Sequence, residues 1–84
     1  MKRNIVVVCR DQDASEFDKL MTEYSACRLS STAWYLNLRD SPEDIQADIL
    51  RHLEKYTTHY IFEATTVTYN TVDSAAANAL DTLF

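Results

Sequence analysis

Two aspartates and two histidines are the side chains of this sequence best suited to binding a metal ion. Asp11 and Asp13 directly follow the apolar run IVVVC at residues 5–9. His52 lies near the end of a predicted helix, and His59 begins a predicted strand. Carboxylates with bound water suit Mg²⁺, and added imidazole groups would suit Mn²⁺ or Zn²⁺. In the competing interpretation, Asp13 caps a helix and both histidines lie in exposed polar loops.

Whether these side chains meet depends on the elements that carry them. Residues 4–10 contain a continuous β-branched run, which is typical of a central strand that is buried on both faces. Residues 14–24 predict a helix, because Asp13 and Glu16 have the spacing of a capping box. Apolar residues recur there at helical spacing and would form the buried face: Phe17, Leu20, Met21 and Tyr24.

Residues 27–38 favour β structure that is interrupted at residues 30–32 (SST). We expect either a tight hairpin there or one bent strand with a bulge. After the interruption, the apolar even positions of WxLxL alternate with Tyr35 and Asn37. We therefore expect Trp34 in the core, with a polar partner for its indole N–H near the end of the sheet.

The second predicted helix begins within RDSPED. Ser41 would be its N-cap and Pro42 its first residue. The acidic residues that follow would interact favourably with the positive end of the helix dipole. A long strand is predicted over residues 59–69, because apolar and β-branched side chains dominate there. A short alanine-rich helix is predicted over residues 74–84.

These elements follow the order β-α-β-β-α-β, with one further helix at the C-terminus. The order indicates an α+β fold of the ferredoxin-like kind, with one domain over residues 1–84. Such a fold has a four-stranded antiparallel sheet with two helices on one face, and its first strand lies between the third and the fourth. The end of the first strand then approaches the start of the fourth, which would place Asp11 and Asp13 near His59.

The sheet face away from the helices must be solvated or covered by a partner. From the alternation along the strands we expect this interface to consist of Tyr35, Asn37, Ile61, Glu63, Thr65 and Val67. A homodimer through this face, or through an extension of the fourth strand, is the predicted assembly. Glu63 would be solvated or paired with an arginine across the dimer, or would act as a general acid.

Composition limits the functions that the chain could have. It has no glycine among its 84 residues, so it cannot carry a Walker loop or a GxGxxG loop, and turns with positive φ must use Asn, Asp, Ser or His. Its 13 acidic and 8 basic side chains give a net charge of −5. This balance disfavours nucleic acid as a partner, although a small local basic patch stays open.

The cysteines and the apolar runs indicate where in the cell the protein is expected. No apolar run approaches the roughly 20 residues of a membrane span, and IVVVC lacks the features of a signal peptide. Cys9 and Cys27 lie in apolar surroundings without CxxC spacing. We therefore expect a cytoplasmic protein with two buried, reduced thiols and no membrane contact.

The runs RLSSTAWYLNLRDSPEDIQADILRHL and YIFEAT, within residues 28–64, carry a resemblance to a known family. They are similar to the SinR-like branch of the small CRISPR-associated ferredoxin-fold nucleases, which combine a Trp strand, a Ser-x-(Asp/Glu)-(Glu/Asp)-Ile helix start and a closing apolar strand. The resemblance implies a ferredoxin-like homodimer and raises cleavage of nucleic acid with Mg²⁺ or Mn²⁺. That activity depends on an acidic residue at the end of the first strand, where this chain has Cys9 or Arg10, so catalysis is not carried over.

Three hypotheses about function follow. The leading one is a non-enzymatic homodimer that acts by contact with another protein, as a regulator or inhibitor of viral or mobile-element origin, without a cofactor. The second is a metal-dependent nuclease with Asp11 and Asp13 as its candidate catalytic residues. The third is an acidic mimic of nucleic acid that blocks a basic groove on a DNA-binding or RNA-binding partner.

Overall fold

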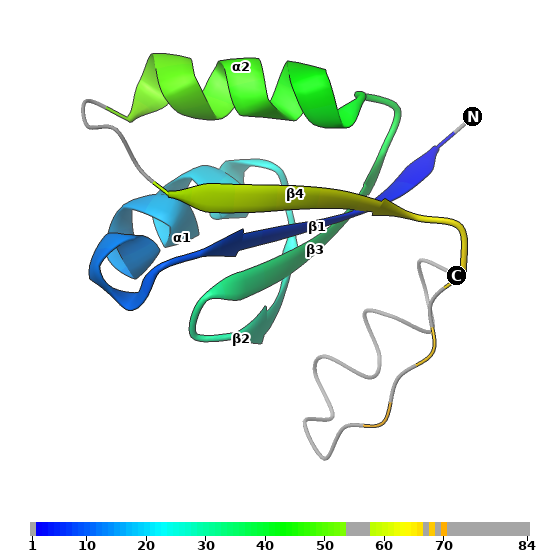
Figure 1. Cartoon of the computed structure of the whole chain (residues 1–84), viewed down its shortest axis with the longest axis horizontal. Coiled ribbons are helices and arrows are strands. Elements are labelled where there is room, and N and C mark those ends of the chain that lie inside the picture. Colours follow the sequence, from blue (N-terminus) through cyan, green and yellow to red (C-terminus); the bar gives the residue numbers. More distant parts are fainter. Residues whose placement is uncertain (1, 54–57, 67, 69, 71–84) are drawn as a thin grey trace.

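The computed structural model describes residues 2–53, 58–66, 68 and 70 (Figure 1). The elements in chain order are β1 (Arg3–Cys9), the 3₁₀ turn η1 (Asp11–Asp13), α1 (Ala14–Glu23), β2 (Cys27–Ser30), β3 (Ala33–Leu38), α2 (Pro42–His52) and β4 (His59–Ala64). The helix predicted over residues 74–84 lies outside the described residues.

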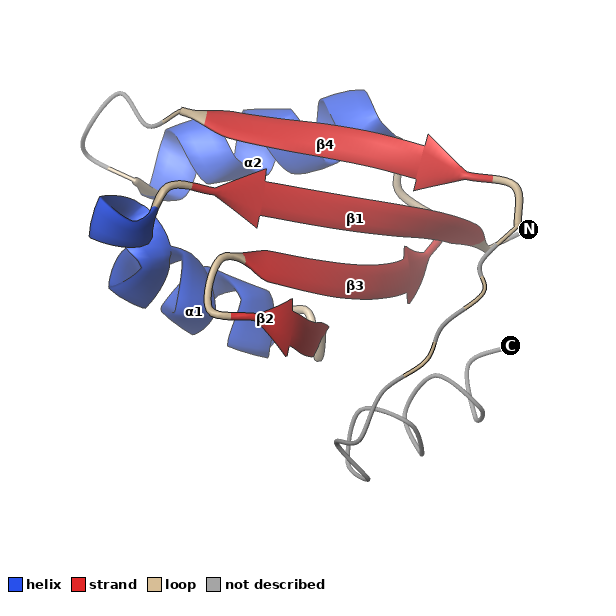
Figure 2. Ribbon diagram, turned by 60° about the horizontal axis from the view of Figure 1, so that its bottom comes forward, coloured by secondary structure: helices blue, strands red, loops and turns tan. Residues whose placement is uncertain are grey.

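The strands form one antiparallel sheet in the order β2-β3-β1-β4. Figure 2 shows both helices against the same face of this sheet. The predicted α+β class is therefore confirmed, and so is the prediction that the IVVVC strand lies between the third and fourth strands. None of the described helices has the length and apolar character needed to cross a membrane.

The hydrophobic core lies between the sheet and the two helices. Ile5 and Val7 of β1 are completely buried in it, together with Phe17 of α1 and Ile45 of α2. Full burial of an aliphatic side chain of this size contributes about 1.5–3 kcal/mol. The core therefore depends on alternate residues of β1 that face both helices at once.

Trp34 lies in this core, as predicted. It is 1% exposed, and its ring stacks against Phe17 with 6.2 Å between the ring centroids. The Arg28 guanidinium lies 5.3 Å from the Trp34 ring centroid, within the range of a cation–π contact. The prediction for the indole N–H was wrong within the described part of the chain, because this buried group has no acceptor there.

The interruption between β2 and β3 is a tight hairpin that also contains a bulge. The pairing register shifts between Arg28 and Ser30, and the chain turns back at once into β3. Arg28 stabilises the turn by donating to the carbonyl oxygens of Ser30 (3.1 Å) and Ser31 (2.8 Å). A side chain thus satisfies the turn carbonyls.

The two helix starts differ from each other. At α2 the predicted cap is confirmed, because the Ser41 hydroxyl accepts from the Asp44 N–H (3.2 Å) and the Asp44 carboxylate accepts from the Ser41 N–H. At α1 the predicted cap was wrong, since Asp13 makes no capping hydrogen bond. Its backbone already has helical angles (φ −102°, ψ −3°), whereas an N-cap residue is normally extended.

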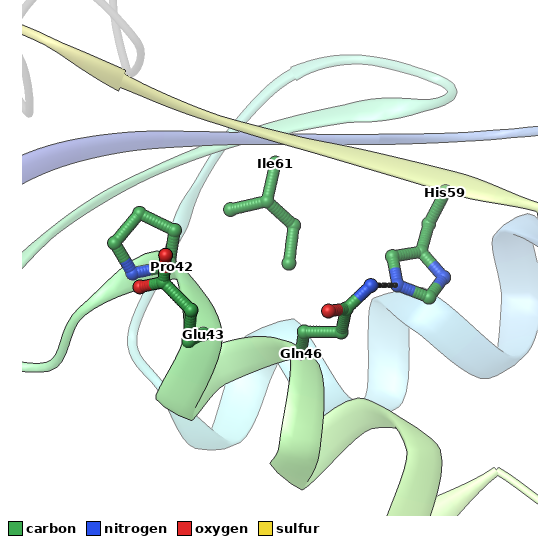
Figure 3. A pocket seen from close by; sticks show the side chains of 5 residues that line it. All are labelled: Pro42, Glu43, Gln46, His59 and Ile61. Atoms are coloured by element: carbon green, nitrogen blue, oxygen red, sulfur yellow. Dashed lines mark hydrogen bonds between the residues drawn. The ribbon is translucent and has the colours of Figure 1, made fainter.

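The facing of β4 also differs from the prediction. His59, Ile61 and Glu63 pair with the core-facing residues of β1, and cross-strand partners share a face, so these three lie on the helix side. Figure 3 shows Ile61 pointing from β4 toward α2. The expectation that Ile61 and Glu63 lie on the uncovered face was therefore wrong. Both faces of β4 carry apolar residues, so the alternation alone could not decide which face is buried.

The length of β4 was overestimated as well. The strand ends at Ala64, and Thr65 lies in a bend after it. Thr65 is exposed, and Val67 lies outside the described residues. The β-branched run therefore continues in sequence beyond the part that pairs with β1, because the β1–β4 pairing ends at Asn4 and Ala64.

Ser25 takes the place that glycine usually has after a helix. Its φ is 57°, in the left-handed region, and the backbone N–H groups of Ser25 and Ala26 donate to Thr22 and Met21 (3.0 Å each). This is the hydrogen-bond pattern of a Schellman C-cap. The prediction that Asn, Asp, Ser or His must supply positive φ is confirmed at this position.

Replacing Ser25 with glycine should stabilise the protein. We expect Ser25→Gly to raise the free energy of unfolding by about 0.5–1 kcal/mol, because it removes the steric cost of a left-handed residue, which the greater freedom of the unfolded chain partly offsets. Urea denaturation measures the change. As a matched control, Ser15→Gly in the exposed part of α1 should lower stability by about 0.5 kcal/mol. A loss of stability in Ser25→Gly would contradict the argument.

Candidate functional site

The sheet face away from the helices is called the open face here. It is formed by the even-numbered residues of β1 and β4 and by the odd-numbered residues of β3, as the strand pairing requires. None of these residues is charged. Among the described residues, no helix or strand covers this face (Figure 2).

Two aromatic side chains of β4 dominate the open face. Tyr60 is 58% exposed and Phe62 is 56% exposed. They lie directly across from Val8 and Val6 of β1, which are only partly buried. Aromatic and β-branched side chains thus form one apolar surface, and an exposed patch of this kind marks an interaction site more often than a single exposed residue does.

A hydrogen-bonded polar cluster lies on the same face beside the aromatic pair. Asn4 Oδ1 accepts from the Tyr35 hydroxyl (2.7 Å) and from Asn37 Nδ2 (2.8 Å). Tyr35 is only 1% exposed, and its burial raises the pKa of the phenol. Tyr35 therefore remains protonated and orients Asn4, rather than offering its own surface to a partner.

The predicted interface residues are thus only partly brought together. Tyr35 and Asn37 lie on the open face as expected, and Tyr35 is buried there. Glu63 instead pairs with Arg3 of the same chain at 3.0 Å, not across a dimer. The sequence reasoning missed Tyr60 and Phe62 because it placed Ile61 and Glu63, from the other face of β4, on the open face. The aromatic pair YxF was visible, but its facing depends on the register with β1.

The candidate aspartates lie at the end of β1, as predicted. Asp11 is exposed in η1, while Asp13 is 8% exposed and accepts from Arg10 Nε at 3.4 Å. Cys9 precedes them, and burial together with the Asp13 charge raises the pKa of its thiol. A thiol that resists ionisation is a poor nucleophile, so Cys9 is unsuited to nucleophilic catalysis.

The candidate histidines occupy two different environments. His59 is paired with Cys9 in the sheet, its ring centroid lies 5.9 Å from that of Phe17, and its Nε2 lies 3.4 Å from the Gln46 amide nitrogen. His52 Nδ1 lies 3.2 Å from the Asp48 carboxylate. Within residues 2–53, 58–66, 68 and 70, no three His, Cys, Asp or Glu side chains converge in a way that could hold a metal ion.

A small pocket lies between α2 and β4 beside His59. Its volume is about 210 Å³, and its lining consists of Pro42, Glu43, Gln46, His59 and Ile61 (Figure 3). The Gln46 side chain reaches from α2 to the imidazole and thereby closes one side of the space. The mixed lining offers one carboxylate, one amide and one imidazole, a set that could contact a polar group but holds no paired acid and nucleophile.

The sequence reasoning missed a network that joins the two helices. The Tyr24 hydroxyl donates to Asp48 Oδ2, and Asp48 Oδ1 accepts from Arg51 at 2.6 Å. The hydrogen bonds from Tyr24 and Arg51 lower the pKa of Asp48, while burial and the bond to Asp48 raise the pKa of Tyr24. The i, i+3 spacing of Asp48 and Arg51 was visible in the sequence. Tyr24 is the C-cap residue of α1, and no local pattern indicates its contact with Asp48.

No protein-family model matches the chain, and a search of the curated proteins finds no significant match.

The Asp48 network should make stability depend on pH. Because the pKa of Asp48 is lower in the folded state, its stabilisation is fully present above the unfolded pKa of about 3.9 and is lost as pH falls through the folded pKa. We expect Asp48→Asn to lower the free energy of unfolding by about 1–2 kcal/mol at pH 7 and by less at acidic pH.

Urea denaturation of the wild type and Asp48→Asn between pH 7 and pH 3 measures this difference. The control is Glu23→Gln, which removes an exposed carboxylate at the end of α1 and should leave stability nearly unchanged. A difference between wild type and Asp48→Asn that is constant with pH would contradict a contribution from the ionised carboxylate.

Proposed function

We propose that this protein is a ferredoxin-like, non-enzymatic interaction module that forms a homodimer through its open face. The strand order β2-β3-β1-β4 with both helices on one face supports the ferredoxin-like assignment. The observation that carries the dimer is the exposure of Tyr60 and Phe62 side by side on an uncharged sheet face. In a twofold dimer the same patch would serve both subunits.

Charge favours a second copy of the chain as the occupant of this face. The protein carries a net charge of −5, so two copies repel each other in most relative orientations. The open face is the region where this repulsion is smallest, because no residue of its strands that points there is charged. Burial of Tyr60 and Phe62 against the partner's equivalents would then stabilise the contact.

The same absence of charge counts against this face as a surface that binds nucleic acid or mimics it. Single-stranded nucleic acid also stacks on aromatic side chains of sheets, but its binding sites add basic residues along the phosphate backbone. A nucleic-acid mimic would instead need acidic side chains in a row. Neither charge is present on the strand positions of the open face.

The dimer is proposed to act in the cytoplasm by contact with another protein, as a regulator or inhibitor. The exposed aromatic residues support an apolar mode of recognition over an electrostatic one. Such binding would tolerate salt, since screening weakens contacts between exposed charges and leaves apolar burial largely intact.

An acidic substitution in the aromatic pair should dissociate the dimer. We expect the wild type to sediment with twice the monomer mass of 9.7 kDa and Phe62→Glu to sediment as a folded monomer, because a buried unpaired carboxylate is costly. Leu50→Glu is the matched control, since Leu50 is 51% exposed on α2, on the other side of the sheet. A monomeric wild type, or a dimer that persists in Phe62→Glu, would refute the proposal.

The metal-dependent nuclease stays a prediction that rests on the resemblance alone. It requires that Mg²⁺ or Mn²⁺ bind and that the double variant Asp11→Ala/Asp13→Ala lose cleavage of nucleic acid. For the non-enzymatic module we expect no heat of binding in a calorimetric titration with either metal and no cleavage of single-stranded or double-stranded substrates. Metal-dependent cleavage that disappears in the double variant would overturn the proposal of a non-enzymatic protein.

A further inference from the structure

A pocket lies at the end of the sheet where β1 begins and where β3 and β4 end. Its volume is about 720 Å³, and the residues that matter here are Lys2, Arg3, Asn4, Arg39, Glu63 and Thr65. Antiparallel pairing brings them together, because the start of β1 lies beside the last residues of both neighbouring strands. We call this space the sheet-end pocket.

The sheet-end pocket is basic in a protein that is acidic overall. Three of the chain's 8 lysine and arginine residues line it, against one acidic residue, Glu63. Lys2 and Arg3 are neighbours in sequence at the start of β1. Arg39 is distant from them in sequence and directly follows β3. The fold therefore gathers a local basic patch in a protein of net charge −5, the possibility that the composition left open.

Several donors in the sheet-end pocket are available to a ligand. Arg3 is held by its 3.0 Å contact with Glu63, and both side chains remain more than 40% exposed. Lys2 and Arg39 are exposed, and neither side chain forms a hydrogen bond or ion pair with another described residue. A guanidinium offers paired N–H donors that match the oxygens of a phosphate group.

Asn4 adds a neutral donor whose orientation is fixed. Its Oδ1 accepts two hydrogen bonds, from Tyr35 and from Asn37, and this assigns the oxygen to the open-face cluster. The Nδ2 atom then keeps both of its N–H groups, with no acceptor among the residues that the structure describes. Asn4 thus joins the open-face cluster to the wall of the sheet-end pocket.

We propose that the sheet-end pocket binds a small, multiply charged phosphate compound, such as a pyrophosphate or a phosphate ester. The ligand would contact the Arg3 and Arg39 guanidinium groups and the Lys2 ammonium group, and Asn4 would donate through Nδ2. Glu63 opposes this binding, because it repels the anion and competes for Arg3. This site shares Asn4 with the open face, but its charged contacts are separate from Tyr60 and Phe62, which carry the proposed dimer.

Inorganic pyrophosphate and a nucleoside diphosphate are the two probes, titrated at fixed ionic strength into uniformly ¹⁵N-labelled protein. We expect saturable shifts of the amide signals of Arg3, Asn4 and Arg39 at ligand concentrations up to about 10 mM. Equal affinity for both probes means that the site recognises the phosphates alone, and tighter binding of the nucleotide means that it also contacts the nucleoside. Absence of saturable shifts with both probes overturns the proposal.

Two pairs of variants separate a built site from general attraction. Arg39→Gln should weaken pyrophosphate binding by about tenfold, whereas Lys19→Gln, which removes one positive charge from exposed α1, should not change it. Glu63→Gln should strengthen binding several-fold, whereas Glu16→Gln on α1 should not. Equal effects within either pair would show that only net charge matters and would overturn the proposal, and circular dichroism verifies that each variant is folded.

Discussion

The two-sided pairing of β1 is the constraint on which the other features of this protein depend. From residue 4 to residue 8 the strand is paired with β3 on one side and with β4 on the other, so its backbone groups are satisfied only in one register with each neighbour. The register determines the facing of every side chain in the three strands. It places Ile5 and Val7 under both helices and leaves Val6 and Val8 on the open face with Tyr60 and Phe62.

The same pairing separates the charges of the molecule. The open face is uncharged, the helix layer carries the Tyr24–Asp48–Arg51 network, and one end of the sheet gathers Lys2, Arg3 and Arg39. The net charge of −5 for the whole chain therefore does not represent the local charge of any of these regions. The proposed apolar contact with a second copy and the proposed phosphate site therefore depend on different side chains, the aromatic pair of β4 and the basic residues at the sheet end.

The absence of glycine shows how side chains can replace a permissive backbone. Ser25 adopts the left-handed conformation after α1, and Arg28 satisfies the carbonyl oxygens of the β2–β3 turn. Ser41 and Asp44 satisfy each other's backbone N–H groups at the start of α2. Each solution uses a polar side chain that pairs locally, and the steric cost of Ser25 is offset by the two hydrogen bonds of its C-cap.

Local patterns in the sequence were sufficient for the features that depend on neighbouring residues. The cap at Ser41, both helices, the central position of the IVVVC strand, the core position of Trp34 and the serine in a positive-φ turn could all be predicted. Periodicity and capping act over a few residues, and the energies that decide them are present in any fold. The α+β class follows from the order of these elements.

Only the tertiary structure decided the features that depend on register and on distant partners. The pairing of His59 with Cys9 decides which face of β4 is buried. The residue types could not decide it, because Tyr60 and Phe62 on one face and Ile61 on the other are all apolar enough to be buried. Asp13 accepts a hydrogen bond from Arg10 instead of capping α1. Asp48 accepts from Tyr24, the C-cap residue of α1. Arg39 and Arg3 line the same pocket, although they come from the ends of different strands. A shift of one residue in register reverses the face of every side chain, and no local pattern opposes such a shift. The sequence therefore determined the elements and the core of this protein, while the pairing of β1 determined its surfaces.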